Sequence, residues 1–357
     1  MTEVYINRIT TVVPPHDVHE AFLGFGRRML GGDNRRLALF DRLVQRAGIE
    51  HRYSFLSPAK TRLDEAVDEQ GFYRFGRFPN TAARMRLFED FAPALAAGAV
   101  EKLLGGEPRG TITHLIVTSC TGLSAPGIDL ELVARCGLRS DIERTFVGFM
   151  GCYAAINALK LARHIVRSEP AARVLTVNLE LCTLHLQQTD HIDEMLSFLL
   201  FGDGCAAALV SAEPRGVVLD SFHAALVPQT ADLIRWHIRE QGFDMRLSGA
   251  VPGAIRGALA RARGDILSGR GARDIALWAV HPGGRTVLDA VEDAFALAPG
   301  DLAASRGVLH DFGNMSSGTV MFVLERLMRQ GEVGAPGCAM AFGPGLVAET
   351  MQFRMAA

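Results

Sequence analysis

The chain has 357 residues, of which 48% are hydrophobic and 21% are charged, and its formal net charge is -2 at pH 7. This balance excludes a disordered tail and lacks the strongly basic character of a nucleic-acid binder. The length predicts two subdomains or one large duplicated fold.

The amino terminus and the cysteines indicate the compartment. Polar residues interrupt the first eight positions, and no later apolar run approaches the ~18 residues of a membrane span. We therefore expect a cytoplasmic protein without a membrane span or a nucleic-acid partner. The cysteines are scattered singly, which disfavours a disulfide framework and a zinc site: Cys120, Cys136, Cys152, Cys182, Cys205 and Cys338.

The first predicted helix covers residues 35–46. Three- and four-residue spacing places Arg35, Arg42 and Arg46 on or near one face of it. On its own, this pattern favours a solvated helix face over a phosphate-binding rim.

Two segments far apart in the chain share one pattern. Residues 109–119 predict a buried strand that runs into a loop, and a helix follows through residues 130–135. Residues 272–280 predict a second buried strand, broken by His281-Pro282-Gly283-Gly284, with a helix through residues 288–292. Short apolar strands that alternate with helices are typical of a mixed or parallel sheet covered on both faces. The repeat indicates an internally duplicated α/β fold.

Further strands are predicted at residues 173–178 and 204–210, with a closing pair around residues 342–348. Proline and glycine interrupt the apolar pattern at residues 213–216, which predicts the boundary between the two halves. We expect an amino-terminal half of residues 1–215 and a carboxy-terminal half of residues 216–357, sharing one compact body.

Cys152 follows a short apolar strand and Gly151, and it is predicted to open a helix. A thiol at the first turn of a helix faces unpaired N–H groups and the positive end of the dipole. We therefore expect a lowered pKa and a nucleophilic thiolate. The alternative is a buried structural cysteine, because free cysteine behaves as a small hydrophobic residue.

A cysteine nucleophile needs a partner that accepts its proton, and histidine is the usual one. Of the eleven histidines, His281 ends a buried strand and precedes a Pro-Gly-Gly break, which predicts an imidazole at a loop mouth. Asn314 lies in a loop that runs into an apolar helix. It is either a helix N-cap or an amide donor aimed at developing oxyanion charge.

Four motifs, in this order and spacing, resemble the type III polyketide synthases, the group that includes chalcone synthase. They are Gly151-Cys152-Tyr153-Ala154, His281-Pro282-Gly283-Gly284, Phe312-Gly313-Asn314-Met315-Ser316-Ser317 and Phe342-Gly343-Pro344-Gly345. The resemblance extends from about residue 36 to the end of the chain. It implies a thiolase-like fold with five α-β-α-β-α layers, a homodimer, and a Cys-His-Asn site reached by a coenzyme A tunnel.

The resemblance also implies the reaction. Cys152 would load a starter acyl group from acyl-CoA, with His281 as its imidazolium partner. His281 and Asn314 would then stabilise the enolate formed when malonyl-CoA loses carbon dioxide. Several extensions would give a chain that cyclises to a resorcinol, resorcylic acid, phloroglucinol or pyrone product, without a metal or redox cofactor.

Other residues match family positions. Phe201 matches an aromatic gatekeeper between tunnel and cavity, although ordinary core packing is an alternative. Arg42 and Arg46 match residues that contact the coenzyme A phosphates, a role suited to guanidinium groups. Leu39 departs from the lysine expected there, which leaves Arg35 or Arg36 as replacements.

Several departures from the plant enzymes fall in the predicted cavity. Trp236 replaces a glycine, His185 a threonine, Met245 a second gatekeeping phenylalanine, and Cys120 one member of a hydroxyl pair. We expect Cys120 and His185 to be wall residues, and the changes favour a bacterial enzyme with a fatty acyl or simple acyl starter. The full predicted wall comprises Cys120, Thr121, His185, Phe201, Trp236, Met245, Ser316, Phe342 and Pro344.

Two other functions remain open at this point. A β-ketoacyl-acyl-carrier-protein synthase III shares the fold and the three site residues but condenses once, and the closing Gly-Pro-Gly loop favours the polyketide interpretation. A catalytically silent partner subunit is the second alternative, which the intact Cys152, His281 and Asn314 disfavour.

Overall fold

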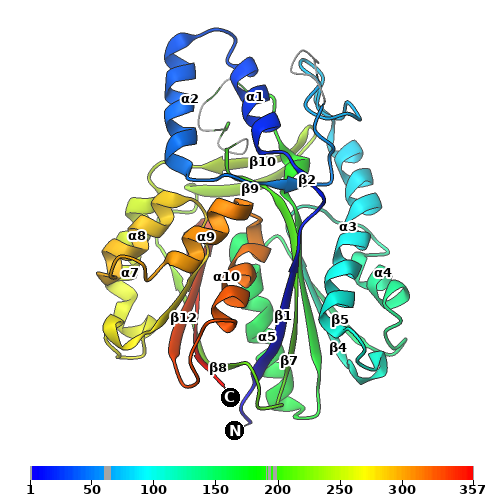
Figure 1. Cartoon of the computed structure of the whole chain (residues 1–357), viewed down its shortest axis with the longest axis vertical. Helices are drawn as coiled ribbons and strands as arrows, with labels where there is room; N and C mark the ends of the chain where they lie inside the picture. The colour runs from blue at the N-terminus through cyan, green and yellow to red at the C-terminus, as the bar shows by residue number, and fades with distance from the viewer. Residues whose placement is uncertain (1, 60–65, 190, 192–193, 196–198, 357) are drawn as a thin grey trace.

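A computed structural model describes residues 2–59, 66–189, 191, 194–195 and 199–356 (Figure 1). Its central element is a nine-stranded sheet in the order β11-β12-β13-β8-β1-β7-β6-β4-β5. The strands are β1 (Tyr5–Val12), β4 (His114–Ser119), β5 (Glu143–Gly148), β6 (Val174–Leu181), β7 (Asp203–Ser211), β8 (Val217–Leu226), β11 (Leu277–Val280), β12 (Pro336–Gly343) and β13 (Val347–Met355).

The sheet consists of two similar parts joined at one narrow seam. Only two residue pairs, between the start of β1 and the start of β8, connect them. The order β1-α3-β4-α4 in the first part recurs as β8-α7-β11-α8 in the second, and α5-β6-β7 recurs as α10-β12-β13. The helices are α3 (Thr81–Leu104), α4 (Ile128–Arg135), α5 (Ala154–Ser168), α7 (Val251–Ile266), α8 (Arg285–Phe295), α9 (Ala303–Phe312) and α10 (Thr319–Met328).

Three apolar cores hold the five layers together. Helices α3 and α4 cover one face of the first part, and α7 and α8 cover the outer face of the second. Helices α5 and α10 fill the space between the two parts. Residues 319–324 of α10 are all buried, as expected for a helix surrounded by other elements. The predicted duplicated α-β-α-β-α architecture is confirmed.

Most predicted elements lie where the sequence places them. The predicted helix at residues 35–46 is α2 (Asn34–Ala47). The predicted strands at 109–119 and 272–280 begin too early, because each starts with a 3-10 turn, at Arg109–Thr111 and Ala272–Asp274. In both turns a local N–H to C=O bond three residues apart replaces the ladder bond that a strand would make. The same deviation in both copies is a further sign of the duplication.

Short elements cover the end of the sheet that carries the site (Figure 1). Helix α1 (His19–Met29) and α2 form a projecting hairpin, and β9 (Ile234–Arg239) pairs with β10 (Gly242–Leu247) beneath it. The strands β2 (His16–Asp17) and β3 (Tyr53–Ser54) lead into and out of this hairpin. No described helix is long and apolar enough to cross a membrane.

Candidate active site

One cavity, with a volume of about 100 Å³, brings together the three predicted catalytic residues and every residue predicted for the wall. It lies beyond the carboxyl ends of β4 and β11, where loops collect at the edge of a parallel sheet. Its lining includes Cys120, Thr121, Cys152, His185, Phe201, Trp236, Met245, His281, Asn314, Ser316, Phe342 and Pro344.

Cys152 sits on a sharp connection between β5 and α5. Phe149 has a φ of 57° and Gly151 a φ of 69°, and a 3-10 turn at Gly151–Tyr153 precedes the helix. A Cβ atom on Gly151 would lie 2.2 Å from Cδ of Pro344. Glycine is therefore needed both for the left-handed backbone and for contact with the closing loop.

The predicted lowering of the Cys152 pKa is wrong for the free enzyme. Burial raises the pKa of the thiol to about 12, although the Ser316 hydroxyl, with Oγ at 3.7 Å from Sγ, opposes the shift. Helix α5 begins only at Ala154, so the thiol precedes the first turn instead of opening it. Loss of water around the sulfur therefore outweighs the helix dipole.

His281 follows β11 and is 1% exposed. Its backbone N–H bonds to the carbonyl of Met340 at 2.8 Å, which fixes the residue at the end of the sheet. Neither ring nitrogen hydrogen-bonds to a described residue, and burial lowers the pKa of the imidazole to about 3. The neutral ring thus offers one donor and one acceptor to the cavity.

Asn314 is held by both its backbone and its side chain. Its N–H bonds to Leu200 at 2.8 Å, and its carbonyl accepts from Gly202 at 3.1 Å, so it pairs with the segment that carries Phe201. Oδ1 accepts from the N–H of Ser316 at 2.8 Å, and Nδ2 donates to the carbonyl of Gly283 at 3.2 Å. Helix α10 begins at Thr319, after the N-cap Gly318, so Asn314 is not its N-cap.

Two family models match nearly the whole chain. "Chalcone and stilbene synthases, N-terminal domain" matches residues 10–214, and "Chalcone and stilbene synthases, C-terminal domain" matches residues 219–356. The chain belongs to the type III polyketide synthases. It is therefore an acyltransferase-type condensing enzyme.

Relatives of this type III polyketide synthase occur in plants and bacteria. Bisdemethoxycurcumin synthase of Oryza sativa subsp. japonica is 35% identical, over 96% of this chain and 90% of the relative. The Alpha-pyrone synthesis polyketide synthase-like Pks18 of Mycobacterium tuberculosis is 36% identical, over 87% and 81% of the two chains. The plant and the bacterial relative are about equally identical to this chain, so the bacterial origin stays a prediction.

Solved structures share the fold along the whole length. PKS-I of the brown alga Ectocarpus siliculosus has a TM-score of 0.89 at 28% identity and covers 99% of both chains. The type III polyketide synthase domain of Steely1 from Dictyostelium has a TM-score of 0.91 at 23% identity, covering 99% of this chain and 100% of that domain. The thiolase-like fold of the polyketide synthase is thus shown twice.

The departures from the plant pattern form one connected wall in this polyketide synthase. Nε1 of Trp236 donates to the carbonyl of Cys120 at 2.7 Å. His185 stacks on Phe243 with ring centres 4.1 Å apart, donates from Nε2 to Thr121 at 2.6 Å, and accepts at Nδ1 from Phe243. Burial lowers the pKa of His185 to about 3, so it is a neutral, hydrogen-bonded wall residue, as expected.

Glu180 is a site residue that sequence reasoning missed. It is fully buried in β6, and its carboxylate accepts hydrogen bonds from Thr121 Oγ1 at 2.9 Å, from Ser317 Oγ at 2.5 Å and from the Cys120 N–H at 3.0 Å. The Cys120 thiol lies 3.4 Å from both carboxylate oxygens of Glu180. Burial, and to a smaller extent the negative charge of Glu180, raises the pKa of this thiol. A signal was present in the sequence, since a carboxylate within a buried strand needs buried hydrogen-bond partners.

Arg52 is a second missed residue. Its fully buried guanidinium donates to the carbonyl of Phe201 at 3.2 Å and to Nδ1 of His19 at 2.9 Å. Phe201 itself is 3% exposed and lines the cavity, so Arg52 fixes the backbone of the predicted gatekeeper. No periodic pattern or motif in the sequence indicated this contact.

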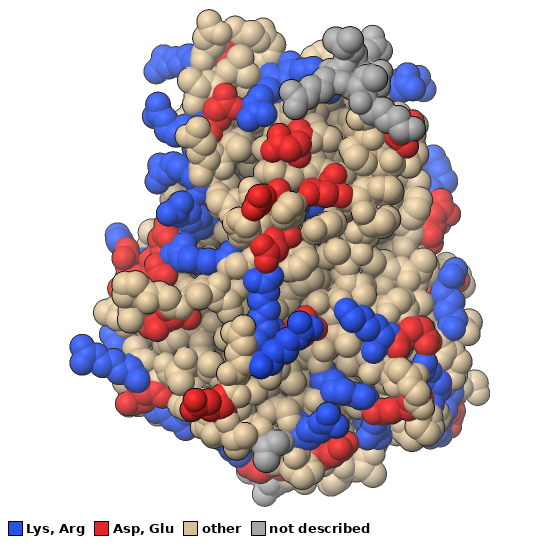
Figure 2. Space-filling model, in the orientation of Figure 1, with Lys and Arg blue, Asp and Glu red and all other residues tan. Residues whose placement is uncertain are grey.

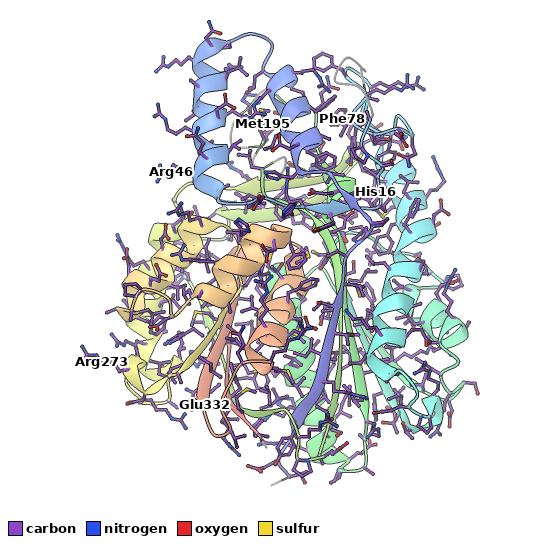
Figure 3. The ribbon with its side chains drawn as sticks, in the orientation of Figure 1. His16, Arg46, Phe78, Met195, Arg273 and Glu332 are labelled. Carbon is purple, nitrogen blue, oxygen red and sulfur yellow. The ribbon has the colours of Figure 1, made fainter. Side chains whose placement is uncertain are left out.

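The predicted coenzyme A residues lie away from the cavity, on the outer face of α2. Arg42 and Arg46 are exposed, and neither forms an ion pair with a described residue. Figure 2 shows Lys and Arg side chains along this edge of the hairpin, and Figure 3 places Arg46 at the carboxyl end of α2.

Proposed function

We propose that Cys152 carries the growing acyl chain of this type III polyketide synthase, with His281 and Asn314 as its partners. The thiolate attacks the carbonyl carbon of a starter acyl-CoA, and the bond from that carbon to the coenzyme A sulfur breaks. The proton of the Cys152 thiol passes to His281 and then to the departing coenzyme A thiolate. The observation that carries this proposal is the shared cavity, which is lined by Cys152, by Asn314 and by His281 with its two unsatisfied ring nitrogens.

Decarboxylation uses the same groups. When malonyl-CoA loses carbon dioxide, the electron pair of the broken bond delocalises onto the thioester oxygen. The Nε2–H or Nδ1–H of His281 and an N–H of Asn314 Nδ2 donate to this oxygen, and such donors are worth about 2.7–4 kcal/mol each in comparable oxyanion sites. The resulting carbanion attacks the acyl carbon on Cys152 and releases the thiolate for the next round.

The lining supports an apolar starter. Val251, Ile255, Leu247 and Met245 face the cavity, while Trp236 narrows it on the side of Cys120. This apolar wall suits a fatty acyl or simple acyl chain, and the product class is a resorcinol, resorcylic acid, phloroglucinol or pyrone. The name of the mycobacterial relative, which specifies alpha-pyrone synthesis, supports the last of these.

The proposed assembly is a cytoplasmic homodimer whose subunits consist of halves 1–215 and 216–357. Strand β5 is an edge of the sheet, and the exposed apolar residues Leu123 (42%), Phe146 (37%) and Met150 (37%) lie on or beside it. An unpaired edge with apolar neighbours favours pairing with a second copy. The free state of all six cysteines supports a reducing compartment.

Coenzyme A is proposed to bind with its phosphates near Arg42 and Arg46. Arginine forms charge-assisted hydrogen bonds with phosphate oxygens. Replacing both with alanine is expected to raise the KM for malonyl-CoA and leave kcat within about twofold, because the lost contacts are equal in the ground and transition states. Arg86→Ala, an exposed arginine on α3, is the control.

One experiment separates the competing functions. The purified protein is incubated with malonyl-CoA and acyl-CoA starters of several lengths, without any acyl carrier protein, and the products are identified by mass spectrometry. Chains extended more than once support the proposal. A product extended only once would indicate the single-condensation alternative, and absence of malonyl-CoA decarboxylation would indicate a silent partner subunit.

A further inference from the structure

Three potential metal ligands lie at the end of the sheet opposite the cavity. His114 is the first residue of β4 and Glu143 is the first of β5, and the two are direct neighbours in the parallel ladder. Glu169 follows the carboxyl end of α5. One ligand atom from each residue lies within 4.8 Å of the others.

Thr113 holds the ring of His114 with Nε2 toward the carboxylate of Glu143. Thr113 Oγ1 accepts from the N–H of Arg173 at 3.0 Å and lies 3.2 Å from its carbonyl oxygen. Oγ1 also lies 2.8 Å from Nδ1 of His114. In the tautomer that carries the proton on Nδ1, this contact is a hydrogen bond from His114, and Nε2 keeps a free lone pair. A hydrogen bond from the other ring nitrogen is the usual way in which a metal-binding histidine is oriented.

Nothing among the described residues competes for Nε2. His114 is 6% exposed, and Nε2 makes no hydrogen bond, although Glu143 Oε2 lies 3.5 Å away. Glu143 and Glu169 have no arginine or lysine partner in the described part of the chain, and both are exposed. Nε2 of His114 and the two carboxylates thus face one another, without a lysine or arginine partner among the described residues.

The spacing suits a small divalent ion. Zinc binds nitrogen and oxygen ligands at about 2.0–2.2 Å, and tetrahedral ligands at such distances lie about 3.4 Å apart. The separation of 3.5 Å between Nε2 of His114 and Oε2 of Glu143 is close to this distance between tetrahedral ligands. The ligand atoms lie at most 4.8 Å apart, so the carboxylate of Glu169 must approach by up to about 1.4 Å, which an exposed side chain does by rotation.

We propose that His114, Glu143 and Glu169 bind a divalent transition-metal ion, with Zn²⁺ as the preferred probe. Water completes the coordination. The sequence predicted no zinc site because the cysteines are scattered, but this site contains no cysteine. The ion lies at the end of the strands remote from Cys152, so it is structural: it ties the edge strand β5 to β4 and to the end of α5.

The test measures zinc binding by the full-length protein after removal of metals with EDTA. Zn²⁺ affinity is determined by competition with a chromogenic chelator, and Co²⁺ is added separately to record its visible absorption bands. Wild-type protein is expected to bind one equivalent that is lost or at least tenfold weaker in His114→Gln and Glu169→Gln. Zn²⁺ should also raise the Tm of the wild type but not of these variants.

Two further variants sharpen the result. Thr113→Val removes the hydrogen-bond partner of Nδ1 and is expected to weaken Zn²⁺ binding about 10- to 100-fold. His164→Gln, which removes an exposed histidine from α5, is the matched control and should bind like the wild type. The cysteines are the same in every variant, so their background binding cancels. Equal stoichiometry and affinity in the wild type and Glu169→Gln, whose exposed side chain is not needed for folding, would overturn the proposal.

Discussion

The indole Nε1 of Trp236 donates a 2.7 Å hydrogen bond to the backbone carbonyl of Cys120, across the cavity wall. This bond joins the β9-β10 hairpin to the end of β4. The indole ring of Trp236 also contacts the ring of His185 edge-on. Trp236 therefore has two separable roles: its volume narrows the cavity, and its N–H satisfies a buried carbonyl.

The two roles of Trp236 predict different consequences for two substitutions. Trp236→Phe keeps most of the volume but leaves the carbonyl of Cys120 without its donor, which costs about 1–3 kcal/mol of stability. We expect a lower Tm and little change in products. Trp236→Gly also opens the cavity, so longer starters or longer products should appear in product analysis by mass spectrometry.

Trp278 provides the matched control, since it is the only other tryptophan. It is buried in the carboxy-terminal core, and its Nε1 has no hydrogen-bond partner among the described residues. Trp278→Phe should leave the product profile unchanged. A wild-type product profile in Trp236→Gly would show that this ring does not limit the cavity.

The sequence was sufficient to predict residues whose chemistry is local. The motifs around Cys152, His281 and Asn314 predicted one shared site, and all three line one cavity. Strand and helix periodicity likewise located β6, β7 and α8. The starts of β4 and β11 were misplaced because each 3-10 turn is followed at once by an isoleucine, Ile112 or Ile275, which extends the apolar strand pattern toward the turn.

The site features that the sequence did not predict depend on partners that are distant in the chain. Glu180 bonds to Ser317, 137 residues away, and periodicity does not reveal which strands and loops meet. The sign of the Cys152 pKa shift was wrong for the same reason. A helix start is visible in the sequence, whereas the burial that outweighs it arises from tertiary packing.

The raised pKa of Cys152 predicts how its reactivity depends on pH and on His281. A thiol with a pKa of about 12 is alkylated tenfold faster for each unit of pH rise below that value. In His281→Gln we expect this slope from pH 6 to 10, because glutamine cannot accept the thiol proton. In the wild type the neutral imidazole of His281 accepts this proton as Cys152 reacts, so iodoacetamide labelling should level off toward the lower end of this range.

Mass spectrometry of the peptide that contains Cys152 gives the rate at each pH. His185→Gln is the matched control: it removes a second buried histidine from the same cavity, one whose nitrogens are both hydrogen-bonded. It should leave the wild-type pH profile unchanged. Identical pH profiles in the wild type and His281→Gln would contradict the role of His281 as proton acceptor for Cys152.

Asn314 is expected to act mainly in decarboxylation. Removal of one oxyanion donor costs about 10²- to 10³-fold in rate. Asn314→Ala should therefore slow malonyl-CoA decarboxylation by this amount, while acyl transfer to Cys152 changes by less than about tenfold. Release of carbon dioxide and single-turnover labelling by acyl-CoA measure the two steps. Asn157→Ala on α5 is the control, and equal losses in both steps would refute the assigned role.

Gly151 tests whether the closing loop must touch the turn that carries Cys152. Gly151 and Gly137 have similar backbone angles, with φ of 69° and 61°, but only Gly151 faces a neighbour. Alanine at Gly137 meets open space and should cost about 1 kcal/mol for the left-handed backbone alone. Alanine at Gly151 pays the same strain and would place Cβ 2.2 Å from Cδ of Pro344, so the loop must move. Both variants should have a lower Tm, and Gly151→Ala should lose more. Gly137→Ala should retain acyl loading, whereas Gly151→Ala should lose it. Full loading in Gly151→Ala would show that the contact with Pro344 is dispensable.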